Sequence, residues 1–279
     1  MHIPPAWFKS SSTVFAPDGR EIPISVWGWG EDESIAKNAA ADRLQRLSGR
    51  IRRGDRLPEE YEYGSRPVKE EILRTIESAV PDQPLGMITR NVYGAQILNT
   101  ARMLFLDIDV QPGTFVQRVL RMFGKGDKEE AVVDRLRDAL QAYGAATFRL
   151  YRTASGLRAM AIDRDFDPAG DEAQQLMRAT MTDPQYARLC LARRSFRARL
   201  TPKPWRCKSS RPPGQHPRTE DDFQMRFQSW LTEYEKSSSG YATCRYFETV
   251  GVGIPKAELT SLLDIHDRVT RSNEPLPLA

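Results

Sequence analysis

The sequence has few cysteines and histidines and no long apolar run. Its three cysteines, Cys190, Cys207 and Cys244, are widely spaced and form no CxxC pair. This spacing argues against a zinc cluster or a disulfide framework, and it favours reduced thiols in a cytoplasmic protein. The three histidines are scattered, so histidine-based catalysis is not expected. No apolar run could span a membrane, and the N-terminus does not resemble a secretory signal.

Acidic residues are absent from one long segment. Between Pro184 and Thr219 there is no Asp or Glu, although the whole chain carries a net charge of only +4. The segment contains three aromatic and ten basic residues, namely Tyr186, Phe196, Trp205, Arg188, Arg193, Arg194, Arg197, Arg199, Lys203, Arg206, Lys208, Arg211 and Arg218. Basic side chains bind phosphates and flat rings stack on bases, which favours a surface for nucleic acid or nucleotide phosphates. The alternative is a solvated basic face that balances acidic residues elsewhere.

The length of 279 residues, with 40% hydrophobic and 28% charged residues, allows one large or two modest globular domains. Residues 1–100 predict an N-terminal ββαα extension. Two strands are expected within residues 6–30 around a turn at 16–19, followed by one helix over 31–53 and a second over 68–80.

Residues 101–205 predict a βαββαβ core. Strands are expected at 102–110, 146–152, 157–163 and 196–200, and helices at 128–143 and at 167–193 with a break at Asp183-Pro184. This order is typical of ferredoxin-like (RRM-like) and palm domains, in which the first and third strands are neighbours and the fourth flanks the first. Residues 206–279 predict an αβα segment packed on the core, so the expected fold class is α+β.

An acidic motif closes the first strand of this core. The apolar residues 103–106 are followed by Asp107, Ile108 and Asp109. Strand side chains alternate, so the two carboxylates share a face about 7 Å apart. Such a pair is costly unless a cation lies between the carboxylates, and Mg²⁺ suits two carboxylates plus substrate phosphates. The alternatives are a haloacid-dehalogenase nucleophile, which requires a Gly-Thr pair where Val110 and Gln111 stand, a sugar-nucleotide transferase, which needs a larger parallel domain, and a strand end that meets solvent.

A second motif lies in the turn over residues 151–158. Small residues and Gly156 let backbone amides approach a phosphate, Ser155 offers a hydroxyl, and Arg152 and Arg158 add positive charge. The alternative is a hairpin turn that happens to carry arginines.

The two motifs together resemble those of the archaeo-eukaryotic primase superfamily, which includes primase-polymerases. In that superfamily the DxD pair holds catalytic metals, a small residue and a histidine contact the nucleotide phosphates, and a later strand supplies a third carboxylate. Asp107 and Asp109 match the first motif, whereas Arg158 stands where the histidine is expected. No residue clearly matches the third motif; Asp163 is the nearest and falls on the opposite strand face from Arg158. The resemblance implies Mg²⁺ or Mn²⁺ as cofactor, and nucleic acid and nucleoside triphosphate as partners.

Two further groups extend the candidate site. Arg90, Asn91 and Tyr93 precede the acidic strand near a glycine turn, where they could contact a phosphate or base or simply build a loop. The second group comprises Arg197 and Arg199, which alternate on the fourth strand, and the following Lys203 and Trp205. These cations could neutralise phosphates, or they could be counter-ions in a metal-free salt-bridge network.

Three functions are compatible with the sequence. The leading hypothesis is metal-dependent nucleotidyl or phosphoryl transfer on nucleic acid, with Asp107, Asp109 and Arg158 as catalytic residues. The second is a non-catalytic nucleic-acid-binding protein that retains the fold, and the third is a bacterial accessory protein with a structural Asp–Arg cluster. The sequence indicates neither a preference for DNA or RNA nor an oligomeric state.

Overall fold

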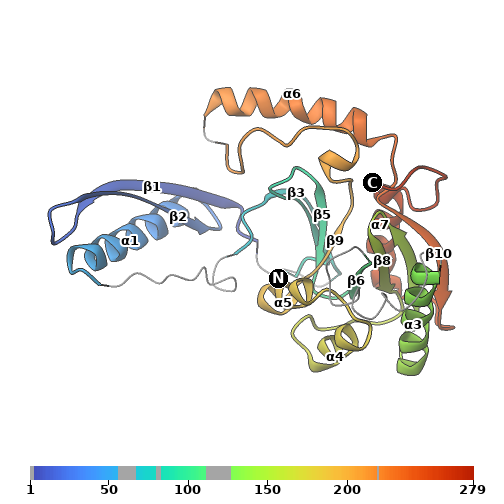
Figure 1. Cartoon of the computed structure of the whole chain (residues 1–279). Coiled ribbons are helices and arrows are strands. Elements are labelled where there is room, and N and C mark those ends of the chain that lie inside the picture. Colours follow the sequence, from blue (N-terminus) through green and yellow to red (C-terminus); the bar gives the residue numbers. More distant parts are fainter. Residues whose placement is uncertain (1–2, 56–66, 80–82, 111–126, 219) are drawn as a thin grey trace. The chain divides into compact units, whose positions relative to one another are not determined.

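The computed structural model describes residues 3–55, 67–79, 83–110, 127–218 and 220–279 (Figure 1). The chain divides into two compact units, His2–Glu71 and Ile72–Ala279, which are described separately. The described residues form three sheets with antiparallel strand pairs and six α-helices, so the predicted α+β class is confirmed.

The N-terminal unit is a β-hairpin packed on one helix, as the sequence predicts. Its elements are β1 (Ala6–Phe15), β2 (Glu21–Gly30) and α1 (Glu33–Arg52). Asp32 caps the helix by accepting a hydrogen bond from the Ile35 amide at 2.8 Å. Gly28 allows the close approach of hairpin and helix, because a Cβ built on it would lie 2.1 Å from the Ala36 carbonyl oxygen.

A strand replaces the second predicted helix. The expectation of a helix over 68–80 is wrong, since Glu71–Ile76 forms β3, which pairs with β4 (Gly86–Arg90). The β-branched side chains of Ile72, Thr75 and Ile76 suit a strand, and a pairing partner outweighs the helical propensity of the neighbouring glutamates.

The first sheet of the larger unit contains strands that are far apart in the sequence. Its order is β3-β4-β5-β9, with β5 at Gln96–Thr100 and β9 at Phe196–Arg199. Leu98 of β5 lies opposite Ala198 of β9, and both side chains are fully buried. The expectation that β9 flanks the acidic strand in one sheet is therefore wrong.

The second sheet carries the acidic strand at its edge. Its order is β10-β7-β8-β6, formed by β6 (Phe105–Asp109), β7 (Phe148–Thr153), β8 (Gly156–Ala161) and β10 (Cys244–Val250). The predicted pairing of the first and third core strands, β6 and β8, is confirmed. On the outer side of β6, the Tyr186 hydroxyl donates to the Phe105 carbonyl (3.2 Å) and the Asp183 amide donates to the Asp107 carbonyl (3.0 Å). These bonds occupy the edge where β9 was expected.

The remaining helices follow the predicted order. They are α3 (Asp127–Tyr143), α4 (Asp171–Ala179), α5 (Pro184–Arg193), α6 (Asp221–Ser238) and α7 (Ala257–Thr270), with a short 3-10 helix, η1 (Pro204–Arg206). The break between α4 and α5 falls at Asp183, which caps α5. Among the described residues, no helix combines the length and the apolar character that a membrane span requires.

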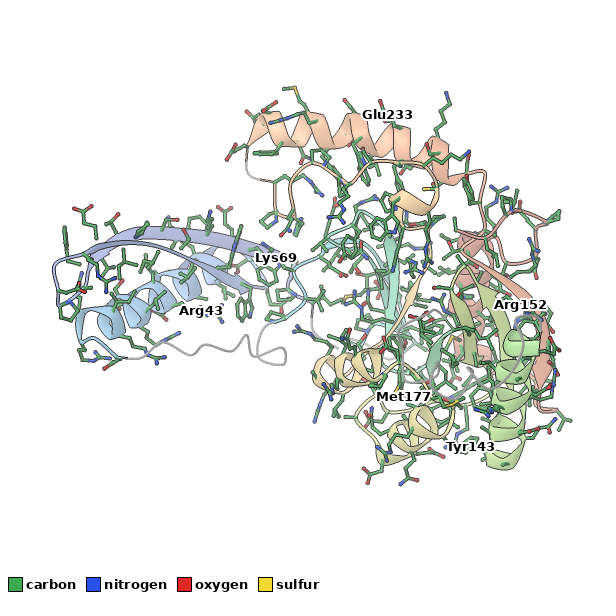
Figure 2. The ribbon with its side chains drawn as sticks, viewed as in Figure 1. Arg43, Lys69, Tyr143, Arg152, Met177 and Glu233 are labelled. Carbon is green, nitrogen blue, oxygen red and sulfur yellow. The ribbon has the colours of Figure 1, made fainter. Side chains whose placement is uncertain are left out.

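Helices α3 and α7 contact opposite faces of the second sheet. Glu248 of β10 pairs with Arg137 of α3 at 2.9 Å, on the face that carries Leu150. Tyr151, on the other face of β7, donates to Asp267 of α7 at 2.8 Å. The side chains between these layers form the main apolar core (Figure 2).

Candidate functional site

Asp107 and Asp109 lie at the end of β6 on one face of the second sheet. The strand register places Asp107 opposite Arg158 and Asp109 opposite Gly156 on β8. The side chain of Asp107 is 48% exposed, and Asp109 is also exposed. Both carboxylates can therefore be reached from solvent, as a ligand-binding pair requires.

Gly156 has a structural role in the second motif. A Cβ built on this residue would lie 2.0 Å from the Ile108 carbonyl oxygen and 3.0 Å from the Val110 amide. Only glycine therefore permits β6 and β8 to pair at this point. Its close contact is with the neighbouring strand, whereas the sequence interpretation assigned it to a phosphate.

Arg158 lies beneath the acidic pair and is only 2% exposed. Its Nε is 3.7 Å from Asp107 Oδ1, and its Nη1 donates to the Arg199 carbonyl at 3.0 Å. Among the described residues, this Nε has no hydrogen-bond partner. The guanidinium therefore joins the acidic strand to β9, and it does so across the two sheets.

Arg158 contacts a buried polar cluster that the sequence analysis did not predict. His266 of α7 is fully buried, with Nε2 3.3 Å from Arg158 Nη1 and Nδ1 2.9 Å from Asp267 Oδ1. Burial alone would lower the pKa of His266, but Cys244 and Asp267 outweigh burial and raise it. Burial likewise opposes the ionisation of Asp267, yet the hydrogen bond from His266 lowers its pKa. The sequence does not reveal this role of His266, because its partner Arg158 is distant in the chain and the two meet only when α7 packs on the sheet.

Cations from β9 and the following loop complete the site. Arg206 Nη2 donates to Ser155 Oγ at 3.0 Å, and Arg199 Nε and Arg206 Nη1 are buried with no hydrogen-bond partner among the described residues. Burial, and then the charge of Arg158, lower the pKa of Arg199 to about 10, which leaves it charged at neutral pH. Burial, and then Arg199 and Arg206, lower the pKa of Lys203, whereas the two aspartates act in the opposite direction.

The remaining predicted arginines have other surroundings. Arg197 shares a strand face with Arg199, and its amide donates to the Tyr186 hydroxyl at 3.2 Å. Arg152 lies on the opposite face of the second sheet from Arg158, 3.6 Å from Glu130 of α3. The structure therefore does not bring Arg152 to the acidic pair.

Of the predicted residues in the β4–β5 turn, two hold the turn by hydrogen bonds and one is exposed to solvent. Arg90 is buried and donates to the Gly94 carbonyl at 3.1 Å, while Asn91 Oδ1 accepts the Tyr93 amide at 3.0 Å. Tyr93 is exposed and forms a T-shaped pair with Trp205, with 5.3 Å between ring centroids. Arg90 and Asn91 thus build the turn that presents Tyr93.

Among the described residues, no third carboxylate joins Asp107 and Asp109 as the primase-like motif requires. Asp163 accepts hydrogen bonds from the Thr147 amide at 2.9 and 3.0 Å, which join the chain after β8 to the chain before β7. Within the described ranges, no group of three or more His, Cys, Asp or Glu side chains has the arrangement of a metal site. The available ligand set is therefore the pair Asp107 and Asp109.

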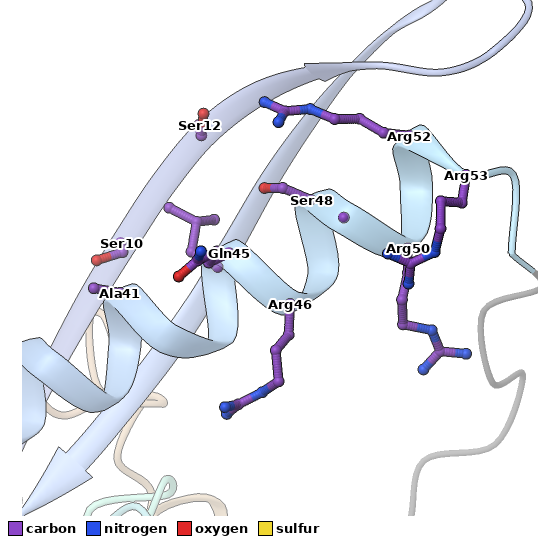
Figure 3. Close-up of a pocket in the computed structure, with 11 residues that line it drawn as sticks. Ser10, Ser12, Ala41, Gln45, Arg46, Ser48, Arg50, Arg52 and Arg53 are labelled. Carbon is purple, nitrogen blue, oxygen red and sulfur yellow. The ribbon is translucent and has the colours of Figure 1, made fainter.

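The N-terminal unit has a separate basic groove between β1 and α1 (Figure 3). The groove has a volume of about 790 Å³, and its polar lining includes Ser10, Ser12, Ser48, Arg46, Arg50, Arg52 and Arg53. None of the predicted site residues lies in it, so the acidic motif and this groove are separate features.

Comparison with known proteins leaves the site to be interpreted from its own chemistry. No family model matches the chain, and no curated protein or solved structure is significantly similar to it.

Proposed function

We propose that the Asp107–Asp109 site binds the phosphates of a nucleotide or nucleic acid and carries out metal-dependent nucleotidyl or phosphoryl transfer. The single observation that carries this proposal is the set of unpaired guanidinium nitrogens beside the two carboxylates. Nε of Arg199 and Nη1 of Arg206 are buried without a hydrogen-bond partner among the described residues, whereas Nε of Arg158 faces Asp107 Oδ1 at 3.7 Å. Buried donors without partners are costly, and an anion such as a phosphate would satisfy them.

In this proposal the basic side chains bind phosphate or position other groups of the site. Arg199, Lys203 and Arg206 would bind phosphate oxygens, and Ser155 would orient Arg206 through its hydroxyl. Arg158 would hold Asp107 in place through the contact at 3.7 Å. We include in this proposal a primase-like activity on a palm-like core. The acidic residues come from the edge strand of one sheet, and the phosphate-binding cations come from β9 of the other sheet and the segment that follows it.

The acidic pair fits a hard divalent cation. Two solvent-accessible carboxylates on one strand face, together with substrate phosphates, form the oxygen ligand set that Mg²⁺ or Mn²⁺ takes. Asp107 and Asp109 would hold the ion, which when bound would neutralise phosphate charge and activate an attacking oxygen.

A second candidate function is nucleic-acid binding without catalysis. It is favoured by the ion pair between Arg158 and Asp107, because a guanidinium that already neutralises the carboxylate competes with a metal. Asp163 bonds to the Thr147 amide beyond the end of β8 that is remote from Gly156, where it does not act as a third ligand, and this favours the same alternative.

Thermal unfolding in the presence of metal and nucleotide tests the proposal. We expect Mn²⁺ plus a deoxynucleoside triphosphate, at about 100 times their dissociation constants, to raise the melting temperature by roughly 5 °C or more. The double variant Asp107→Asn, Asp109→Asn should lose this rise. The variant Asp221→Asn, Asp222→Asn, which changes two exposed carboxylates at the start of α6, should keep it.

Extension of a labelled primer in the presence of Mn²⁺ then separates the two functions. Incorporation that disappears in the Asp107→Asn, Asp109→Asn variant supports catalysis. Salt-sensitive binding of nucleic acid with neither a metal-dependent rise nor incorporation supports the non-catalytic alternative. If the wild-type protein binds neither the triphosphate nor nucleic acid, both functions are refuted and the Asp–Arg cluster is structural.

A further inference from the structure

Two aromatic rings from distant parts of the chain form an exposed pair beside the candidate site. We call Tyr93 and Trp205 the aromatic platform. The rings meet edge to face at 5.3 Å, yet Tyr93 is 42% exposed and Trp205 is 46% exposed. Elsewhere in this unit, neighbouring aromatic rings such as Trp230 and Tyr234 stack within the core. The exposure of the platform leaves apolar ring surface in contact with solvent.

The turn that carries Tyr93 is held by several hydrogen bonds. Asn91 Oδ1 accepts the amides of Tyr93 (3.0 Å) and Ala95 (3.1 Å), and the Asn91 carbonyl accepts the Gly94 amide at 2.9 Å. Gly94 has a φ of +85°, and a Cβ on it would lie 2.1 Å from the Trp230 ring. The turn is thus fixed against α6, so little backbone freedom is lost when a ligand binds to Tyr93.

The segment that carries Trp205 is also anchored. Pro204 and Cys207, on either side of the tryptophan, are both buried. The Pro204 carbonyl accepts hydrogen bonds from the Cys207 amide (3.1 Å) and the Ser209 amide (2.9 Å). Two buried neighbours therefore hold an exposed indole in a defined position.

Positive charge surrounds the platform and links it to the acidic pair. Lys203 Nζ and the Arg211 guanidinium lie 5.6 and 5.7 Å from the centroid of the Trp205 ring. Arg206, which follows Trp205 in the chain, donates to Ser155 Oγ at 3.0 Å, and the Ser155 carbonyl accepts the amide of Val110, the residue after Asp109, at 2.9 Å. The flat face of the Trp205 indole, supported edge to face by Tyr93 and flanked by cations, is suited to a base with its attached phosphate backbone.

We propose that the aromatic platform stacks an unpaired base of a single-stranded nucleic acid whose backbone continues to the Asp107–Asp109 site. This inference rests on the proposed function and specifies its substrate as a single strand. A duplex keeps its bases stacked on one another, whereas a single strand leaves a base face free to stack on Trp205, which Tyr93 holds in place edge to face. The flanking cations bind the backbone without regard to sequence, so the platform selects for unpaired bases and not for a particular base.

Binding of two oligonucleotides to the full-length protein tests the inference. One is a thymidine oligomer of about ten nucleotides, within the usual site size, and the other has the same backbone with abasic positions. Trp205→Ala should weaken binding of the thymidine oligomer roughly tenfold, the loss expected for one stacked base. It should leave binding of the abasic oligomer unchanged. Tyr93→Ala should weaken the thymidine oligomer in the same direction.

Two further variants separate stacking from loss of folding and from charge. Val92→Ala removes an equally exposed apolar side chain from the same turn but no ring, and it should bind both oligomers as the wild type does. Trp205→Phe keeps an aromatic ring and should recover part of the affinity that Trp205→Ala loses. Lys203→Ala should weaken both oligomers and reduce the slope of log affinity against log salt by about one.

The inference is overturned if Trp205→Ala binds the thymidine oligomer as tightly as the wild type does. It is also overturned if Trp205→Ala weakens both oligomers equally, since Trp205 would then act through the fold or the charge. Neither result affects the proposed function, because the rise in melting temperature with Mn²⁺ and triphosphate depends on Asp107 and Asp109. Conversely, if that rise is absent but the oligomer results are as expected, the protein binds single-stranded nucleic acid through the aromatic platform without catalysis.

Discussion

Asp267 allows a sharp prediction of stability, because its carboxylate organises the polar cluster behind Arg158. It accepts hydrogen bonds from Arg149 at 2.7 Å, Tyr151 at 2.8 Å and His266 at 2.9 Å. Its side chain is only 14% exposed, so solvent screens these bonds weakly. We therefore expect Asp267→Asn to destabilise the larger unit although the variant keeps the shape of the side chain.

The expected size of this effect follows from the bonds that are lost. Removing one charge from a buried pair costs about 3–5 kcal/mol, and the oxygen that asparagine retains places this variant at the low end, about 3 kcal/mol. In native-state hydrogen exchange, the most protected amides of residues 148–161 should then exchange roughly 100-fold faster.

A matched control is available on the same helix. Asp264 is exposed on α7, so Asp264→Asn should leave exchange in residues 148–161 unchanged. Peptides from residues 6–15 in the N-terminal unit provide the reference within each sample. Acceleration of less than about fivefold, equivalent to 1 kcal/mol, would refute the view that Asp267 holds this cluster together.

Three further predictions concern other parts of the molecule. Gly28→Ala should unfold the N-terminal unit, because the added Cβ would lie 2.1 Å from backbone. Gly49→Ala inside α1 should instead stabilise this unit by about 0.5–1 kcal/mol. Far-UV circular dichroism distinguishes the two, because only Gly28→Ala should lose the signal of the unit. Tyr186→Phe should cost about 1–3 kcal/mol in urea unfolding, because it leaves a buried carbonyl and amide without their hydroxyl partner. The pKa of His266 is raised by Cys244 and Asp267 despite burial, so its protonation stabilises the fold below about pH 6.5 and this contribution is lost as pH rises through the folded-state value. The wild type should therefore lose melting temperature as the pH rises above about 6.5, and His266→Asn should flatten this dependence; an unchanged slope in the variant would contradict the assignment.

The sequence predicts many local elements of the fold, because their signals lie within short windows, but it missed the strands β3, β4 and β5. The apolar period over 128–143 gives α3, and the Asp183-Pro184 break separates α4 from α5. The pairing of β6 with β8 follows from the order of the elements and is confirmed. The sheet that receives β9 could not be predicted, because its partner β5 lies about a hundred residues earlier and nothing local specifies that pairing.

Part of the candidate site was also predictable, because some of its residues lie in short sequence motifs. Asp107, Asp109 and Arg158 lie on adjacent strands, which the order of the elements predicts, and strand alternation places the two aspartates on one face. His266 could not be predicted, because a lone histidine in a helix has no spacing that marks it. Its contact with Arg158 exists only because α7 covers the sheet.

Gly156 affects how relatives of this protein should be recognised. Since a side chain at this position would strike the backbone of the acidic strand, glycine is required by the sheet whether or not the site binds anything. A chain that had lost every charged group of the site would still need it. Glycine at position 156 is therefore a requirement of the β6–β8 pairing, whereas position 158, which lies opposite Asp107, is the more informative position when the sites of two such chains are compared.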